Sequence, residues 1–271
     1  MGIFDKWKKN TQKASEADAG QGSVELTLEQ ASETARSIAG QLGYPCQIFS
    51  SRASYEDVMD AYEKALLQGR QEGYTPILVP ADEVLEEYLG ILKGDGYSLE
   101  DTLKAELESG EELLKKRFQE YTEAEAGEFD MEEFVGEFDG EPEVVDRYSA
   151  FQDALSDKNL ETLLFKIPTV RPWEVVAYVP FGGWNECPEA GKMMAVCKYW
   201  YEKYGAVPVT ISHDVMEMRV PAPVSEKDAL QAAKEHFAFT PDRVFQGTAT
   251  ETLSELAVCV AASKIWYFWW D

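Results

Sequence analysis

Apolar residues recur at helical spacing along much of the chain, and most of these stretches follow a residue that commonly caps a helix. The first stretch begins after Thr27 and ends at Gly43, which precedes Tyr44-Pro45. Further helix starts are indicated by Ser54-x-x-Asp57, Asp82, Ser98-x-x-Asp101, Pro188, Ser225-x-x-Asp228 and Thr248-x-x-Glu251. The stripe after Ser98 predicts one helix that runs to Phe118.

Short apolar or alternating stretches between these helices predict strands. The clearest is 215–220, where Met216, Met218 and Val220 alternate with Glu217 and Arg219. The other predicted strands are 46–49, 75–79, 174–179, 207–211 and 266–271. Because strands alternate with helices, the pattern predicts an α/β fold, a layered domain with a mixed β-sheet flanked by helices.

Composition divides the chain into four parts. Residues 1–23 are small and polar after a short basic start and predict a flexible N-terminal tail. Residues 24–119 form an N-terminal α/β part, and 120–146 form an acidic insertion. Residues 147–271 form a C-terminal α/β part that we expect to make one compact unit with 24–119.

The acidic insertion holds twelve Asp and Glu residues and no Lys or Arg. Two interpretations of it stay open. It is a solvated, mobile segment, or it is an acidic docking segment that folds on a basic partner. Apolar residues punctuate the acids and would supply the contacts of the second interpretation: Phe129, Met131, Phe134, Val135 and Phe138.

The net charge of the chain favours some classes of binding partner and disfavours others. Fifty acidic residues against twenty-five basic ones give a net charge of −25, and such a chain repels nucleic-acid phosphate. No run of eighteen apolar residues is present, which excludes a membrane-spanning helix. No secretory signal follows the first residues, so we expect a cytoplasmic protein. Ile3, Phe4 and Trp7 would at most allow weak contact with a membrane surface.

Four cysteines, at positions 46, 187, 197 and 259, form no Cys-x-x-Cys pair, which favours reduced, buried thiols over a zinc site or a disulfide framework. No P-loop, dinucleotide-binding, HExxH or EF-hand motif is present, so no metal and no cofactor are predicted. His213, Asp214 and Glu217 are metal-capable, but His213 and Glu217 alone on one strand face make an incomplete site.

The loop at 181–188 is the best candidate for a small-molecule site. It is glycine-rich and lies between a predicted strand and a predicted helix, where ligands often bind in α/β folds. Trp184 and Asn185 are candidate binding residues. Cys187 would lie near the helix N-terminus, where a thiolate is stabilised, with His213 or His236 as a base. A tight turn with a buried thiol is the alternative.

Three residues elsewhere complete the candidate set. Glu217 is placed to face the loop, and Asp242 with Gln246 lies in a structured loop after Phe239 and Pro241. Asp242 would either cap backbone donors or face a ligand. His236 lies on the apolar face of its helix and is expected to be a hydrogen-bonded core histidine.

The C-terminal hundred residues resemble a known family. The segments are FGGWNECP at 181–188, KYWYEKYGA at 198–206, HDVMEMRVPAPV at 213–224, TPDRVFQG at 240–247 and WYFWWD at 266–271. Their order and spacing resemble the bacterial domain-of-unknown-function family 4253, strongly over 165–271 and weakly over 55–95. Thr240 departs from the family pattern, in which many members have a cysteine there. The resemblance implies a bacterial, cytoplasmic, compact α/β domain and no activity.

Two functions of different class remain. The first is a non-enzymatic acidic protein-binding module, immunity-like or regulatory, that recognises a basic partner. The alternative is a small-molecule-binding protein or an enzyme with its site at the 181–188 loop. Because no complete set of catalytic residues is present, the binding module is the favoured hypothesis and an enzyme is the less favoured one.

Overall fold

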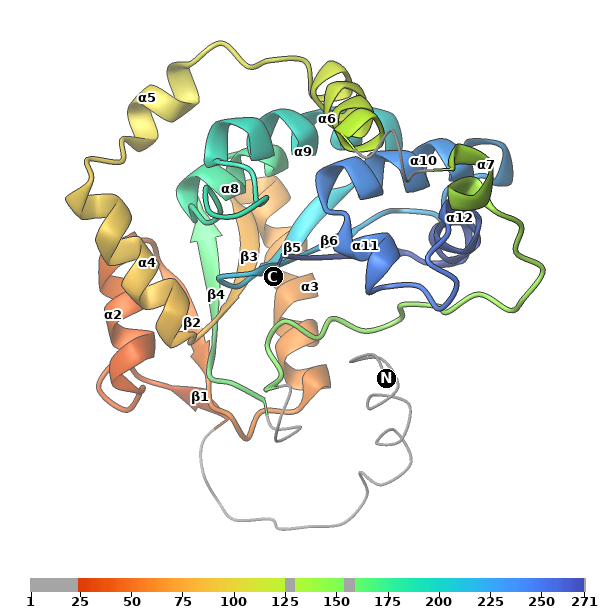
Figure 1. Cartoon of the computed structure of the whole chain (residues 1–271). Coiled ribbons are helices and arrows are strands. Elements are labelled where there is room, and N and C mark those ends of the chain that lie inside the picture. Colours follow the sequence, from red (N-terminus) through yellow and green to blue (C-terminus); the bar gives the residue numbers. More distant parts are fainter. Residues whose placement is uncertain (1–23, 125–129, 154–158, 271) are drawn as a thin grey trace.

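A computed structural model describes residues 24–124, 130–153 and 159–270 of the chain. Among these residues, seven strands form one sheet in the order β1-β2-β4-β3-β5-β6-β7 (Figure 1). The strands are β1 (Glu25–Leu26), β2 (Cys46–Phe49), β3 (Thr75–Pro80), β4 (Thr162–Ile167), β5 (Val207–Ile211), β6 (Val215–Arg219) and β7 (Ile265–Trp269). The α/β fold with a mixed, helix-flanked sheet is confirmed.

The directions of the strands bring the loops that follow several of them to one edge of the sheet. β3 and β5 are parallel, whereas all other neighbours are antiparallel. Since β2 and β3 both run against β4, and β5 and β7 both run against β6, the strands β2, β3, β5 and β7 share a direction. Their carboxyl ends meet at the same edge, which we call the carboxyl edge. Asp82 follows β3 there, and His213 follows β5.

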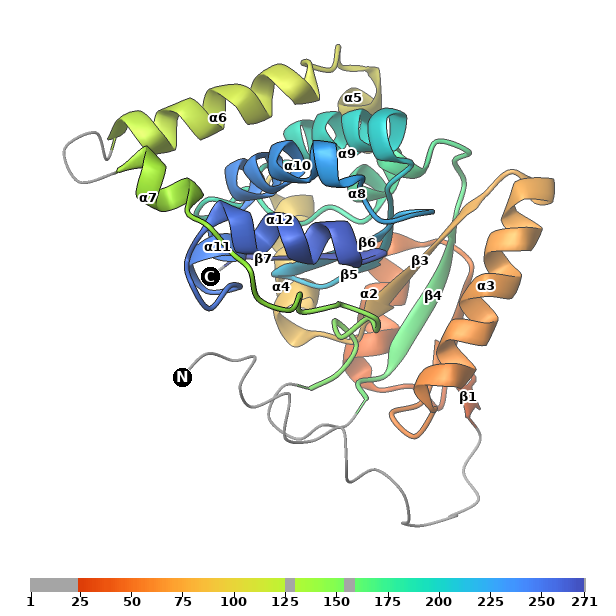
Figure 2. The ribbon, with the colours of Figure 1, turned by 90° about the vertical axis from the view of Figure 1, so that its right-hand side faces the viewer.

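The helices cover the two faces of the sheet unequally. α3 (Tyr55–Glu72) lies alone on one face, with the segment 145–151 beside it (Figure 2). The other face carries the main hydrophobic core. Its helices include α2 (Glu33–Leu42), α4 (Glu83–Gly94), α8 (Val175–Tyr178), α9 (Ala190–Tyr204), α10 (Glu226–Phe239) and α12 (Leu253–Ala262). α11 (Asp242–Phe245) contacts β7, α10 and α12.

Several predicted helix starts are confirmed in atomic detail. The side chains of Ser54 and Asp57 form a reciprocal capping box at the start of α3. Asp82 and Ser98 accept hydrogen bonds from the first turns of α4 and of α5 (Leu99–Lys104). Two starts differ. α2 is capped by Ser32 and α12 by Thr252, a few residues beyond the predicted positions.

The prediction of a strand at 174–179 is wrong. Residues Pro172–Glu174 form a 3-10 turn that continues into α8. Pro172 suits the first position of such a turn because its missing N–H is not needed there. The strand at this point in the chain is β4, which the sequence analysis did not identify. The β-branched residues of α8 are buried, so packing outweighs their strand preference.

The long helix predicted after Ser98 is two helices, α5 and α6 (Gly110–Ala124). Gly110 allows the first turn of α6 to lie against α9. A Cβ there would lie 2.3 Å from the backbone oxygen of Ala195 on α9, so only glycine allows this close approach.

Part of the acidic segment packs on the protein. α6 lies on α9 and α10, and α7 (Met131–Val135) lies on α12. Phe134 is buried, with its ring 4.8 Å from that of Phe237. The expectation of a solvated segment is therefore wrong for Phe134, which is a core residue. Phe129 lies outside the described residues.

Candidate functional site

The loop 181–188 is held by helices on both sides. Gly182 and Gly183 both adopt positive φ angles, and a Cβ on Gly182 would lie 2.3 Å from the oxygen of Pro188. The hydroxyl of Tyr88 on α4 donates to the oxygen of Gly182. Arg117 on α6 donates to the oxygen of Glu186 at 3.0 Å. The glycines thus make a tight turn that is fixed to the core.

Cys187 is buried, which opposes a role as a nucleophile. Burial raises the pKa of its thiol, and the negative charge of Asp214 adds to that rise, whereas the charge of Arg117 lowers it. The thiol is therefore protonated at neutral pH. The expected stabilisation of a thiolate by the start of α9 is outweighed, and the structure supports the alternative of a tight turn with a buried thiol.

The rest of this loop is more open. Asn185 is exposed and adopts a φ of 46°, which is unusual for a residue other than glycine. Trp184 is half-buried and packs against the main core. These two candidates therefore lie at the surface of the turn, whereas Cys187 lies beneath it.

Glu217 does not face the loop. It is fully buried in β6, on the sheet face that α3 and the segment 145–151 cover. Its carboxylate accepts hydrogen bonds from the backbone N–H groups of Ser149 and Ala150, from the Ser149 hydroxyl, and from the Thr210 hydroxyl. Burial raises the pKa of Glu217, and these hydrogen bonds oppose that rise. The prediction of Glu217 as a binding residue is wrong, because both oxygens are already occupied.

Asp242 and Gln246 form a local pair on α11. The Gln246 side-chain amide donates to Oδ1 of Asp242 at 2.8 Å, and Gln246 is exposed. The six candidate residues therefore fall in three places: the loop 181–188, the buried interior of β6, and α11. Glu217 lies apart from the loop, on the sheet face that α3 covers, whereas Arg117 bonds both Glu186 of the loop and Ala238 at the end of α10, which precedes α11.

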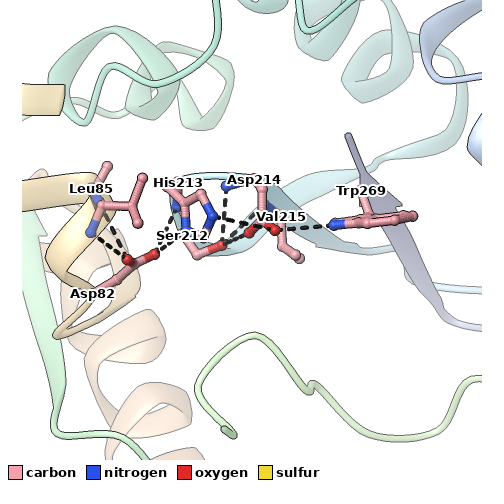
Figure 3. A network of polar contacts seen from close by, with 8 residues as sticks. Asp82, Leu85, Ser212, His213, Asp214, Val215 and Trp269 are labelled. Atoms are coloured by element: carbon pink, nitrogen blue, oxygen red, sulfur yellow. Dashed lines mark hydrogen bonds and ion pairs between the residues drawn. The ribbon is translucent and has the colours of Figure 1, made fainter. Parts of the chain in front are cut away.

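A different cluster occupies the carboxyl edge (Figure 3). Nδ1 of His213 forms a hydrogen bond with Oδ2 of Asp82, the residue that caps α4. Nε2 of His213 lies 3.4 Å from Oδ2 of Asp214. The same oxygen of Asp214 accepts a hydrogen bond from the indole of Trp269 at 3.0 Å, and the Ser212 hydroxyl donates to Oδ1 at 2.9 Å.

Charge in this cluster favours the imidazolium form. Burial alone would lower the pKa of His213, but the hydrogen bond to Asp82 and the charges of the two aspartates raise it overall. The hydrogen bonds from His213 and the backbone hydrogen bond from Leu85 likewise lower the pKa of Asp82, against the opposing effect of burial. His213 thus forms a charged link between the start of α4 and the β5–β6 turn.

The geometry limits what the cluster can do. Both ring nitrogens of His213 face carboxylates: Nδ1 bonds Asp82, and Nε2 lies 3.4 Å from Oδ2 of Asp214. No group of three or more His, Cys, Asp or Glu side chains in the described ranges could hold a metal ion. The cluster links α4 to the β5–β6 turn, and the sequence analysis missed it because Asp82 and His213 lie far apart in the chain.

Trp200 and Tyr204, two residues of the family-like motif at 198–206, also have a structural role. They lie on α9, and both donate hydrogen bonds to the carboxylate of Glu235 on α10, at 3.1 and 3.2 Å. Lys203 forms an ion pair with the same carboxylate at 2.7 Å. This buried acceptor fixes α9 on α10, and nothing in the pattern of the sequence pointed to it.

His236 is buried as predicted, but it is not hydrogen-bonded. Neither ring nitrogen has a hydrogen-bond partner within the described part of the chain. The ring packs against Trp266, Phe268 and Trp200 at centroid distances of 4.5, 4.9 and 5.4 Å. Burial and the charge of Arg243 lower its pKa well below the ordinary value, so the ring is neutral.

The acidic segment presents an exposed surface, which we call the acidic face. Its carboxylates extend from α6 across α7 into the segment that follows. The sequence has no Lys or Arg between residues 120 and 146, although Glu120 forms an ion pair with Lys116, one turn earlier on α6, at 3.7 Å. α6 and α7 lie side by side at one end of the molecule (Figures 1 and 2). The exposed members are Glu120, Glu123, Asp130, Glu132, Glu133, Glu137, Asp139, Glu141 and Asp146.

Comparison with known proteins finds a family match for the C-terminal part of the chain. Residues 163–271 match the model of a family described as a domain of unknown function, DUF4253. The resemblance over this region is therefore confirmed. Searches of curated proteins and of solved structures found no match.

The strands of the DUF4253 region are not all neighbours in the sheet. The region supplies β4 to β7, but β3 lies outside it and is inserted between β4 and β5. Asp82, the partner of His213, also precedes the matched region. Among the described residues, no helix is both long and apolar enough to cross a membrane.

Proposed function

We propose that the protein is a non-enzymatic binding module that recognises a basic protein partner through the acidic face. The observation that carries this proposal is the set of exposed carboxylates of the acidic face, four of which lie on α6 and α7, helices that are held by core packing. A fixed face loses less conformational entropy on binding than a segment that must fold on its partner. Like charges gathered on one face also steer a basic partner into contact.

The alternative site at the 181–188 loop has weaker support. Cys187 is buried and protonated, and Glu217 lies on the sheet face that α3 covers, where both of its oxygens accept hydrogen bonds. A catalytic function would need a nucleophile or base that is accessible at the loop. We therefore favour binding over catalysis.

The test compares two variants with equal changes in charge. The face variant replaces four carboxylates by glutamine at Glu120, Glu123, Glu132 and Glu133. The control variant replaces four exposed carboxylates around α2 and α4, at Glu29, Glu33, Glu83 and Glu87. Each variant has a net charge of −25 + 4 = −21, so only the position of the lost charge differs.

Tagged wild type and both variants are used to capture proteins from the lysate of the native host at low and high salt, with mass spectrometry as the readout. We expect a basic protein that is retained by wild type and by the control variant at low salt, and lost from the face variant. High salt should release it, because the screening length falls from about 10 Å at 0.1 M to about 3 Å at 1 M. Equal retention by the two variants would contradict the proposal.

A further inference from the structure

A groove lies on the sheet face that α3 covers, remote from the acidic face. It runs between α3 and the strands β1, β2 and β4 and has a volume of about 370 Å³. This volume is within the range of sites that hold small ligands, which is about 300–1,000 Å³. No role has been given above to the residues that line it.

Short side chains on α3 open the groove. Ala61 and Ala65 face the sheet from α3, and Phe49 and Leu164 form the apolar part of the floor. Gln47 lies on the same face of β2 as Phe49, since alternate residues of a strand share a face. The groove therefore has a short apolar floor with polar groups along its length.

The charges of the groove are ordered from one end to the other. α3 begins close to the carboxyl end of β2, so Asp57 and Asp60 lie at the Phe49 end, beside Glu25, which pairs with Phe49. Lys64 and Gln68 lie farther along α3.

The opposite end of the groove is basic. Lys166 lies near the other end of β4, where its ammonium group is 4.9 Å from the ring centre of Tyr74. Lys64 on α3 is the second cation that lines the groove, with Gln47 and Gln68, and the Gln68 amide donates to the carboxylate of Glu72 at 2.6 Å. The groove is thus acidic at one end and basic at the other.

We propose that this groove binds a short zwitterionic peptide, with the peptide's ammonium group at Asp57 and Asp60 and its carboxylate at Lys64 and Lys166. The spacing selects the length of the ligand. Asp57 and Lys64 are seven residues apart, which is about 10 Å along a helix axis. An extended tripeptide spans about 10 Å, whereas a single amino acid is too short to reach both ends.

The test is a titration of the isotopically labelled full-length chain with tri-alanine, followed by amide chemical shifts. We expect shifts of the amides of Gln47, Ala61 and Lys64. Alanine and N-acetyl-tri-alanine amide should bind at least about 5-fold more weakly, because each lacks one or both end contacts. Binding of the uncharged peptide as tightly as tri-alanine would overturn the proposal, as would the absence of shifts at the groove.

Paired variants separate the groove from general charge effects. K64Q/K166Q removes the basic end, and K104Q/K227Q removes two exposed lysines elsewhere, on α5 and α10. The first pair should weaken tri-alanine binding at least about 5-fold, and the second should leave it unchanged. An equal effect of the two pairs would refute a specific carboxylate contact. Since none of these residues lies on the acidic face, the result is independent of the proposed partner binding.

Discussion

Replacing Phe237 with alanine should release the acidic face from the protein. The Phe237 ring is fully buried on α10. Phe118 and Tyr121 of α6 meet it edge-on at centroid distances of 5.9 and 5.5 Å, and Phe134 of α7 at 4.8 Å. One side chain therefore joins both helices of the acidic face to the core.

The expected cost follows from this burial. Removing a fully buried phenylalanine ring typically lowers the free energy of unfolding by about 3–5 kcal/mol. The loss of four edge-to-face pairs, including the one with Phe245, places F237A toward the upper end of that range. Domains have total stabilities of about 5–15 kcal/mol, so the variant should still fold in the absence of denaturant.

Urea unfolding followed by circular dichroism gives the change in the free energy of unfolding, and hydrogen exchange shows where protection is lost. The amides of α6 and α7 should lose more protection than those of β3 and β4. F245A is the matched control: Phe245 contacts Phe237 at 5.5 Å but is 40% exposed, and its loss should cost about 1–2 kcal/mol. A cost of F237A no larger than that of F245A, or unchanged protection of α6, would refute the reasoning.

Three further outcomes are expected. Glu217→Gln should lower the free energy of unfolding in urea by about 1–3 kcal/mol, because an amide cannot accept from all four donors and one, such as the Ala150 N–H, is left unpaired; an unchanged value would contradict the role of this carboxylate. His213 has a raised pKa in the folded protein, so its stabilising effect should be complete below about pH 6.5 and lost as pH rises through the folded-state pKa. The difference in stability between wild type and His213→Asn should therefore shrink with rising pH, and a difference that grew would disprove the link. Cys187 should resist iodoacetamide in the folded protein and react in urea, whereas rapid alkylation in the native state would revive the nucleophile hypothesis.

The features that were predicted correctly from the sequence depend on residues close to one another in the chain. Ser54 with Asp57, and Asp82, cap their helices as predicted because a cap depends on residues within one turn of each other. The alternation at 215–220 placed Met216 and Met218 in the core because strand geometry alone assigns alternate residues to one face. The resemblance over 165–271 also rested on residues that can be read in order along the chain.

Contacts between distant residues were decided only by the tertiary structure. The partners Asp82 and His213 are 131 positions apart, and Glu217 accepts hydrogen bonds from residues 67 and 68 positions away. The sequence alone therefore allowed Glu217 to be predicted as a binding residue, whereas the segment 145–151 covers it in the structure. Residues 174–179 have strand-like side chains, yet burial between the sheet and α9 makes them helical. Periodicity and caps thus determined the elements and the fold class, because those depend on neighbouring residues. The roles of the polar residues depended on which distant groups satisfy them once water is excluded.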